Sequence, residues 1–242
     1  PVVVVLPENM LRAASSRPPC GPVKVPEPAL SSAQITQLQG YLCAAQRPVV
    51  LFGGSGWTAT AARQLETFAA ANDVPLVAAF RYHDICDNHH PCFVGDAGVG
   101  MLGYIKTLLR DADMIVALNI RFGEMTTDGY DLFDLPKMAA TLIHSNASDA
   151  ELGKIYIADL PLQAGPNAMA EALAGVRLEQ NANRKAWCGA AKAAYDDSFT
   201  VAAQPGALDM GAVLAHLRDV LPDNAIVTNG AGNFATWPSK FI

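Results

Sequence analysis

Histidine and cysteine side chains gather between His83 and Cys92, a stretch with three histidines, two cysteines and two aspartates. These are common ligands of zinc and related metals. Their spacing matches no closed zinc motif, and polar loops collect the same residue types for contact with water, so we disfavour a metal site. A nucleophilic pair of Cys86 and His83 is equally unsupported, because no orienting third group or oxyanion donor can be identified. No catalytic or metal-ligating residue is therefore assigned here.

A glycine-rich run, Gly53-Gly54-Ser55-Gly56, follows the unbroken apolar residues 49–52. Glycine tolerates positive φ and lets the backbone approach a ligand closely. A strand, a glycine turn and a helix in succession present backbone N–H groups to a phosphate in doubly wound α/β domains. The run lacks the full G-x-G-x-x-G spacing, so a nucleotide-facing turn and a merely tight turn remain equal alternatives.

Two polar residues follow later apolar runs, where ligands of open α/β sheets bind. Arg121 comes after residues 114–118 and could hold a phosphate bidentately, or pair with Glu124 or Asp128 on the surface. Asn146 comes after residues 141–144 and could bind a ribose or start a turn. A second glycine turn at residues 230–233 lacks a nearby lysine and is a weak phosphate loop by spacing alone.

Apolar runs alternate with amphipathic stretches along the chain, which predicts an α/β fold: a doubly wound parallel sheet with the strand at residues 49–52 in its centre. Residues 7–10 are expected to form a turn and residues 81–98 an irregular loop. Asp209 should cap a helix whose Val213, Leu214, Leu217 and Leu221 point inward. The expected strands are 2–6, 49–52, 75–80, 114–118, 141–144, 154–157 and 225–228, and the other expected helices are 31–45, 58–72, 99–110, 167–174 and 181–199.

Composition narrows the class of protein. Apolar residues make up 51% of the 242 residues and charged residues only 17%, which suggests that other domains or subunits cover part of the surface. The net charge of −6 and the absence of a Lys/Arg run disfavour nucleic acid and anionic membranes as partners. No apolar run reaches the roughly 18 residues of a membrane span. The five scattered cysteines fit reduced thiols in a cytoplasmic protein.

Five stretches carry a resemblance to a known family. They read VVVVLPENM (2–10), RPVVLFGG (47–54), DNHHPCFVG (87–95), DMIVALNIRF (113–122) and AIVTNGAGNFATW (225–237). The first resembles the closing strand of the pyrimidine-binding domain of thiamine-diphosphate-dependent enzymes. The next three resemble the first strand, the Asp…His-Pro…Gly loop and the central strand of their Rossmann-like central domain, and the last resembles the opening of their diphosphate-binding domain. The acetolactate synthase-like enzymes are the most similar group.

The resemblance implies a division of the chain. Residues 1–10 would end the pyrimidine-binding domain, 11–30 would be a linker, 31–178 the central domain, 179–206 a helical linker and 207–242 the start of the diphosphate-binding domain. The full-length enzyme would be a carboligase or decarboxylase of 2-oxo acids, a lyase or transferase that uses thiamine diphosphate and Mg²⁺ and forms a homodimer or homotetramer. The activating glutamate is expected before residue 1 and the metal motif after residue 242, so the fragment alone should be inactive. The alternative is a nucleotide-binding Rossmann-like module without thiamine chemistry.

The resemblance also assigns site residues. Gly53, Gly54, Gly95, Arg121 and Phe122 match the edge that holds FAD in flavin-dependent members. Two departures disfavour FAD, since Asn146 stands where an acidic residue is common and Gly165 where an aspartate is expected; ADP, or no ligand, is the alternative. The remaining match is a Gly-Gln-His turn that contacts thiamine diphosphate, where this chain has Gly232, Asn233 and Phe234.

Overall fold

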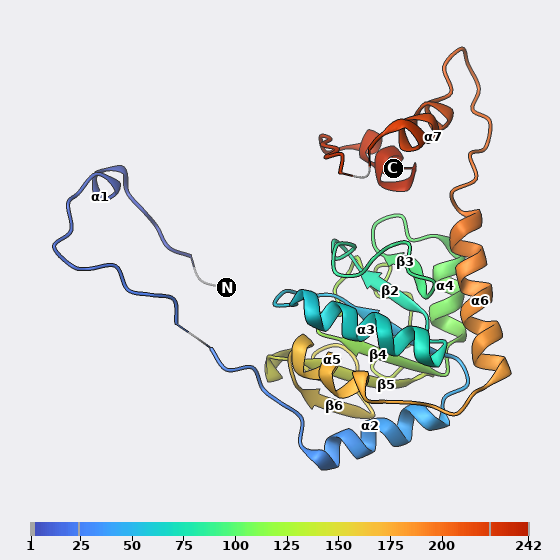
Figure 1. Ribbon diagram of the computed structural model, residues 1–242, viewed down its shortest axis with the longest axis horizontal. Helices are drawn as coiled ribbons and strands as arrows, with labels where there is room; N and C mark the ends of the chain where they lie inside the picture. Colours follow the sequence, from blue (N-terminus) through green and yellow to red (C-terminus); the bar gives the residue numbers. More distant parts are fainter. Residues whose placement is uncertain (1–2, 24, 223, 242) are drawn as a thin grey trace.

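The computed structural model of the protein describes residues 3–23, 25–222 and 224–241. Its centre is a six-stranded sheet whose neighbouring strands are all parallel, in the order β3-β2-β1-β4-β5-β6 (Figure 1). This confirms the predicted α/β class. The strands are β1 (Pro48–Phe52), β2 (Leu76–Ala79), β3 (Phe93–Ala97), β4 (Met114–Leu118), β5 (Thr141–Asn146) and β6 (Leu160–Gln163).

The sheet is doubly wound about β1. The chain first adds β2 and β3 on one side of β1, then returns to place β4, β5 and β6 on the other. Every residue of β1 is buried, because the strand lies between two neighbours and two layers of side chains. The predicted central position of residues 49–52 is therefore confirmed, and the order of the strands reverses between β1 and β4.

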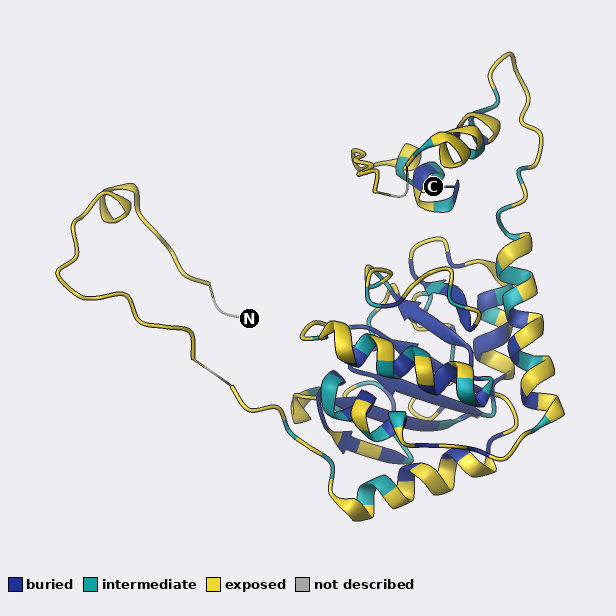
Figure 2. Ribbon diagram, viewed as in Figure 1, coloured by how far each residue is buried: buried dark blue, intermediate teal, exposed yellow. Residues whose placement is uncertain are grey.

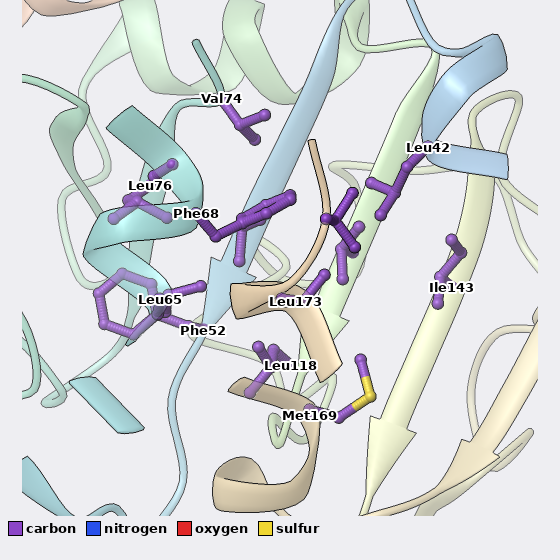
Figure 3. Packing of buried hydrophobic residues seen from close by; sticks show 14 of the residues in the cluster. Leu42, Phe52, Leu65, Phe68, Val74, Leu76, Leu118, Ile143, Met169 and Leu173 are labelled. Atoms are coloured by element: carbon purple, nitrogen blue, oxygen red, sulfur yellow. The ribbon is translucent and has the colours of Figure 1, made fainter. Parts of the chain in front are cut away.

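Helices cover both faces of the sheet. Val50 and Phe52 of β1 join the core beneath α2, α3 and α5, where Phe68 and Met169 also pack (Figure 3). Val49 and the alternate residues of β1 face the second core, which α4 and α6 cover. The bounds are α2 (Ser32–Ala44), α3 (Ala59–Asn72), α4 (Gly103–Asp111), α5 (Pro166–Ala174) and α6 (Ala182–Asp197).

Helix α6 is fixed to the end of α3 by a buried arginine. Arg184 donates from Nε to the carbonyl of Asn72 (2.8 Å) and from Nη2 to the carbonyl of Glu179. The Asn72 side chain in turn donates to the Val176 carbonyl (3.2 Å) and accepts from the N–H of Leu178 (2.7 Å). The segment expected as a helical linker therefore contains a helix that packs on the sheet domain.

The structure corrects two strand predictions within the sheet. Residues 93–97 form β3, although they lie in the expected irregular loop; the sequence hides this strand because it carries a glycine and an aspartate, and its register slips opposite β2. Residues 154–157 form no strand. Tyr156 serves packing instead, since its ring is buried edge-on against Phe122 and Phe133, whereas Ile157 is exposed. The last strand is β6, where Leu160 and Leu162 face inward.

The described residues at the two ends of the chain contain no sheet strand. Val2 lies outside the described residues, and residues 3–6 are exposed and irregular (Figure 2). The expected turn after them is a short helix, α1 (Glu8–Leu11), and the strand expected at residues 225–228 is also irregular. Asp209 caps α7 (Met210–Val220) as predicted, but only Leu214 of the four expected inward residues is buried. The chain ends in η2 (Asn233–Ala235) and α8 (Thr236–Phe241).

Candidate functional site

The glycine turn after β1 lies at the carboxyl edge of the sheet, beside the exit of β4. Gly54 has a φ of +70°, and a Cβ at this position would overlap the carbonyl oxygen and side chain of Asn119. Only glycine fits this combination of a left-handed backbone and a close approach. Asn119 itself has a φ of +57°, which asparagine tolerates better than most residues.

Side-chain donors occupy three of the four carbonyl groups of this turn, those of Gly53, Ser55 and Gly56. Asn119 Nδ2 donates to the carbonyls of Gly53 (3.1 Å) and Ser55 (2.9 Å), and Trp57 Nε1 donates to that of Gly53 (2.8 Å). Asn167 Nδ2, at the start of α5, donates to the carbonyl of Gly56 (2.9 Å).

The N–H groups of the same turn are left open. Within the described ranges, the amides of residues 54–57 have no hydrogen-bond acceptor. Occupied carbonyls and open N–H groups give the turn a positive local field, which favours an anion. An anion such as a phosphate or carboxylate is the kind of ligand whose charge matches this turn.

Arg121 and Phe122, in the loop after β4, differ in burial. The Arg121 side chain is 69% exposed, and its Nε lies 3.6 Å from Glu151 Oε1, a different acidic partner from those considered above. Lys154 approaches the same carboxylate oxygen at 3.4 Å. Phe122 is buried edge-on against His144, with ring centroids 5.1 Å apart. Arg121 is thus exposed near the carboxyl edge of the sheet, whereas Phe122 packs in the core beside His144.

The end of β5 holds the exit of β4 in place. His144 Nε2 and Asn146 Nδ2 lie 3.1 and 3.2 Å from the carbonyl oxygen of Ile120, and Asn146 Oδ1 accepts from the N–H of Ser148 (2.9 Å). Both functional atoms of Asn146 are therefore used within the protein. Burial lowers the pKa of His144, against the opposing influence of the Ile120 carbonyl and Glu151, so the ring is neutral and donates from Nε2.

Three buried polar atoms near this end of β5 have no partner among the described residues: Nδ1 of His144, Oγ of Ser145 and Oη of Tyr156. Burial raises the pKa of Tyr156, which keeps its hydroxyl protonated. The sequence patterns gave no hint of these atoms.

The other predicted residues lie apart from this edge. Gly95 sits within β3, where a Cβ would crowd the hydroxyl of Tyr104. Gly232, Asn233 and Phe234 form an exposed turn before α8, with Gly232 at a φ of +114° and open space around it.

Sequence reasoning missed Asn119, although an asparagine directly after a buried strand is a usable signal.

The loop between β2 and β3 has the character of packing and solvation. His83 lies 3.4 Å from Asp96, which raises the pKa of its imidazole, and burial raises the pKa of the Cys86 thiol to about 12. A thiol with that pKa is a poor nucleophile at neutral pH. The described part of the chain contains no group of three or more His, Cys, Asp or Glu side chains that could hold a metal, and none of its helices is long and apolar enough to span a membrane.

Comparison with known proteins places this architecture. Along its entire length the chain is 25% identical to the large subunit of acetolactate synthase isozyme 2 from Escherichia coli and to the acetolactate synthase large subunit from Parasynechococcus marenigrum. It covers 43% and 40% of those proteins, so it spans less than half of their length. An acetolactate synthase from Mycobacterium bovis is 26% identical over 87% of the chain, which covers 35% of that relative.

The family described as thiamine pyrophosphate enzyme, central domain, matches residues 35–173. These residues hold the whole parallel sheet, from β1 to β6, and the glycine turn. Since the match covers more than half of the 242 residues, the chain belongs to the thiamine pyrophosphate enzymes, and residues 35–173 are their central domain.

Proposed function

We propose that this chain is the middle part of a thiamine-diphosphate-dependent enzyme that joins or decarboxylates 2-oxo acids. The observation that carries the proposal is the similarity of the whole chain to acetolactate synthase large subunits, together with its membership of the family. When bound, thiamine diphosphate supplies the carbanion chemistry for breaking and forming bonds beside a carbonyl. Mg²⁺ as the partner of its diphosphate, a homodimeric or homotetrameric enzyme and a cytoplasmic location belong to the same proposal.

The proposed division of the chain follows the resemblance: the end of a pyrimidine-binding domain at 1–10, a linker at 11–30, the central domain at 31–178, a helical linker at 179–206 and the start of a diphosphate-binding domain at 207–242. Exposed apolar side chains at both ends support it. Val3 and Leu6 near the start, and Ile226 and Phe234 near the end, are all exposed although residues of these types are usually buried. Further domains of the full-length enzyme would cover them.

The turn at Gly232, Asn233 and Phe234 is our proposed contact for thiamine diphosphate. Its residues are exposed, and the backbone of Gly232 is open to close approach. The side-chain amide of Asn233 offers an N–H donor to a phosphate oxygen, whereas Phe234 offers none. In the full-length enzyme, Asn233→Ala should raise the dissociation constant of thiamine diphosphate roughly tenfold, for about 1–1.5 kcal/mol lost.

Calorimetry on the full-length enzyme tests this assignment. Asn88→Ala is the matched control, because Asn88 is also exposed but lies in the loop between β2 and β3. Equal affinities in the two variants would remove the turn from the thiamine-diphosphate site.

The carboxyl edge of the sheet is our proposed nucleotide site. Gly53 and Gly54 would bring the open N–H groups of their turn to a phosphate, and Arg121 would add a charged donor. Phe122 and Asn146 would act through packing and through the Ile120 carbonyl, because the Asn146 side chain is buried and each of its polar atoms already bonds within the protein. ADP is preferred to FAD in this proposal because Asn146 and Gly165 stand where the resemblance expects acidic residues. Gly95 has a packing role in β3, which leaves its predicted ligand contact without support.

Turnover by the full-length enzyme tests the proposed activity. A panel of 2-oxo acids is offered with thiamine diphosphate and Mg²⁺, and release of CO₂ is measured. We expect turnover that disappears when thiamine diphosphate is omitted. Nucleotide binding without any such turnover would favour a plain nucleotide-binding module and overturn the proposal.

A further inference from the structure

The linker before α2 touches the sheet domain through one carboxylate. Glu27 Oε1 accepts from the backbone N–H groups of Asn167 (2.9 Å) and Ala168 (3.3 Å), and Oε2 accepts from Asn167 Nδ2 (2.9 Å). Among the described residues from 3 to 30, no other residue makes a hydrogen bond or ion pair to the rest of the protein. Within these described residues, Glu27 therefore makes the only polar contacts that hold a long exposed segment to the sheet domain. The segment passes the start of α5 in Figure 1.

The first turn of α5 has room for this carboxylate because Gly165 has no side chain. A Cβ at Gly165 would overlap the Glu27 carboxylate and its Cγ. The backbone of Gly165 has a φ of −79°, so the glycine is required here by the contact and not by its conformation. The amino end of a helix favours negative charge, and Glu27 supplies it from a distant part of the chain.

One side chain connects Glu27 to the glycine turn. Asn167 donates both to Glu27 and to the carbonyl of Gly56, and its Oδ1 accepts from the N–H (3.0 Å) and hydroxyl (2.9 Å) of Thr58. The Glu27 carboxylate and the turn with the open N–H groups of residues 54–57 are thus joined through a single bridging residue, Asn167. A phosphate on that turn would lie close to a second negative charge.

We propose that the linker is a strap that Glu27 closes over the nucleotide edge, so that docking of the strap and binding of a nucleotide phosphate at the glycine turn oppose one another. This inference rests on the nucleotide site proposed above. Repulsion between carboxylate and phosphate, together with their shared neighbour Asn167, provides the coupling. Such coupling is reciprocal: releasing the strap must tighten phosphate binding, and bound phosphate must release the strap.

Nucleotide affinity gives the first readout, with ADP as the probe. Glu27→Gln keeps the size of the side chain and removes its charge, and calorimetry should show ADP binding about fivefold tighter than in the unmodified protein, within the usual range of coupling. Glu8→Gln is the matched control, because Glu8 is exposed on the same segment and pairs only with Arg12; its ADP affinity should not change.

Release of the strap gives the second readout. Trypsin cleaves after Lys24, three residues before Glu27, and must hold the neighbouring residues extended to do so. Cleavage should be several-fold faster in Glu27→Gln, and also in Gly165→Ala, where the added methyl group expels Glu27 without changing the cleaved segment. ADP should accelerate this cleavage in the unmodified protein.

The outcomes separate the strap from the site beneath it. Equal ADP affinity in the unmodified protein and Glu27→Gln, with faster cleavage in the variant, would overturn the coupling and leave the nucleotide site standing. No ADP binding to either protein would overturn both. Unchanged cleavage in Glu27→Gln and Gly165→Ala would show that Glu27 does not fasten the linker, and would also overturn the proposal.

Discussion

Two short apolar runs in this chain have opposite fates. Residues 3–6 (VVVL) and 49–52 (VVLF) look equally suited to a buried strand, yet Val5 is 79% exposed whereas Leu51 is completely buried. The second run has β2 and β4 on either side and a helix layer on each face; the first has no strand beside it among the described residues. An apolar run therefore indicates that a segment is able to form a strand, and the strands and helices beside it determine whether the strand forms.

Truncating one side chain in each run should give the largest difference. Leu51→Ala opens a cavity in the centre of the sheet and should lower the free energy of unfolding by about 2–5 kcal/mol. Val5→Ala, the control, should change it by less than about 0.5 kcal/mol. Urea denaturation of this chain measures both. If Val5→Ala destabilised the chain as strongly as Leu51→Ala, the contrast between the two runs would be broken.

The turn after β1 extends the comparison from side chains to backbone. Gly54→Ala places a left-handed alanine against Asn119, and strain and overlap together should cost about 2–4 kcal/mol. Gly100→Ala has a similar φ of +75° but open space around it, so only the strain of about 1–2 kcal/mol should remain. Equal losses in urea denaturation would mean that the contact with Asn119 does not shape the turn.

Lowering the pH should reduce the stability of the folded chain through one buried polar residue, His144. The pKa of His144 lies below its ordinary value near 6.5 in the folded chain, so the unfolded chain takes up a proton first as the pH falls. Stability should therefore drop below about pH 6.5, by at most about 1.4 kcal/mol per pH unit for this one proton.

His144→Gln should lose less stability than the unmodified chain between pH 7.5 and 5.5. Comparing the two proteins removes the contribution of His83, whose pKa is raised by Asp96 and whose effect has the opposite sign. Parallel stability curves would show that His144 is not held neutral by burial.

A small effect on stability is expected at the exposed Arg121. Arg121→Ala removes a long surface contact with Glu151 and should change the free energy of unfolding by less than about 0.5 kcal/mol. The same change should weaken ADP binding by roughly 1.5–3 kcal/mol, the range for a charged hydrogen bond. Lys154→Ala, which gives up contact with the same carboxylate, is the control and should leave ADP affinity nearly unchanged. Identical ADP affinities in all three proteins would reject Arg121 as a phosphate ligand.

The fold was largely predictable where apolar runs are continuous. Strands β1, β2, β4 and β5 are such runs, and their alternation with helices sufficed for a parallel sheet. The edge strand β3 was missed because it contains Gly95 and Asp96. Residues 154–157 were mistaken for a strand because they include Tyr156, whose ring is buried in the aromatic cluster around Phe122 and not in a sheet.

The candidate site was predictable only in its local part. Gly53 and Gly54 could be selected from the sequence because they directly follow a continuous apolar run. Asn119, Asn167 and Glu27 act across 66, 111 and 140 residues of chain, and no periodicity in a single sequence reports such contacts. Asn146 was correctly placed at the edge, but its hydrogen bonds to Ile120 and Ser148 depend on the loop after β4, which the sequence pattern does not describe.

The buried Arg184 bears on where the polypeptide can be cut. The part that sequence comparison delimits ends at residue 173, yet buried Asn72 makes three of its hydrogen bonds to Val176, Leu178 and Arg184. A domain boundary drawn from similarity would sever these bonds and uncover the face of β3 that α6 protects. The smallest piece suited to independent expression should therefore run through α6 to about residue 199, beyond the stretch that the family match delimits.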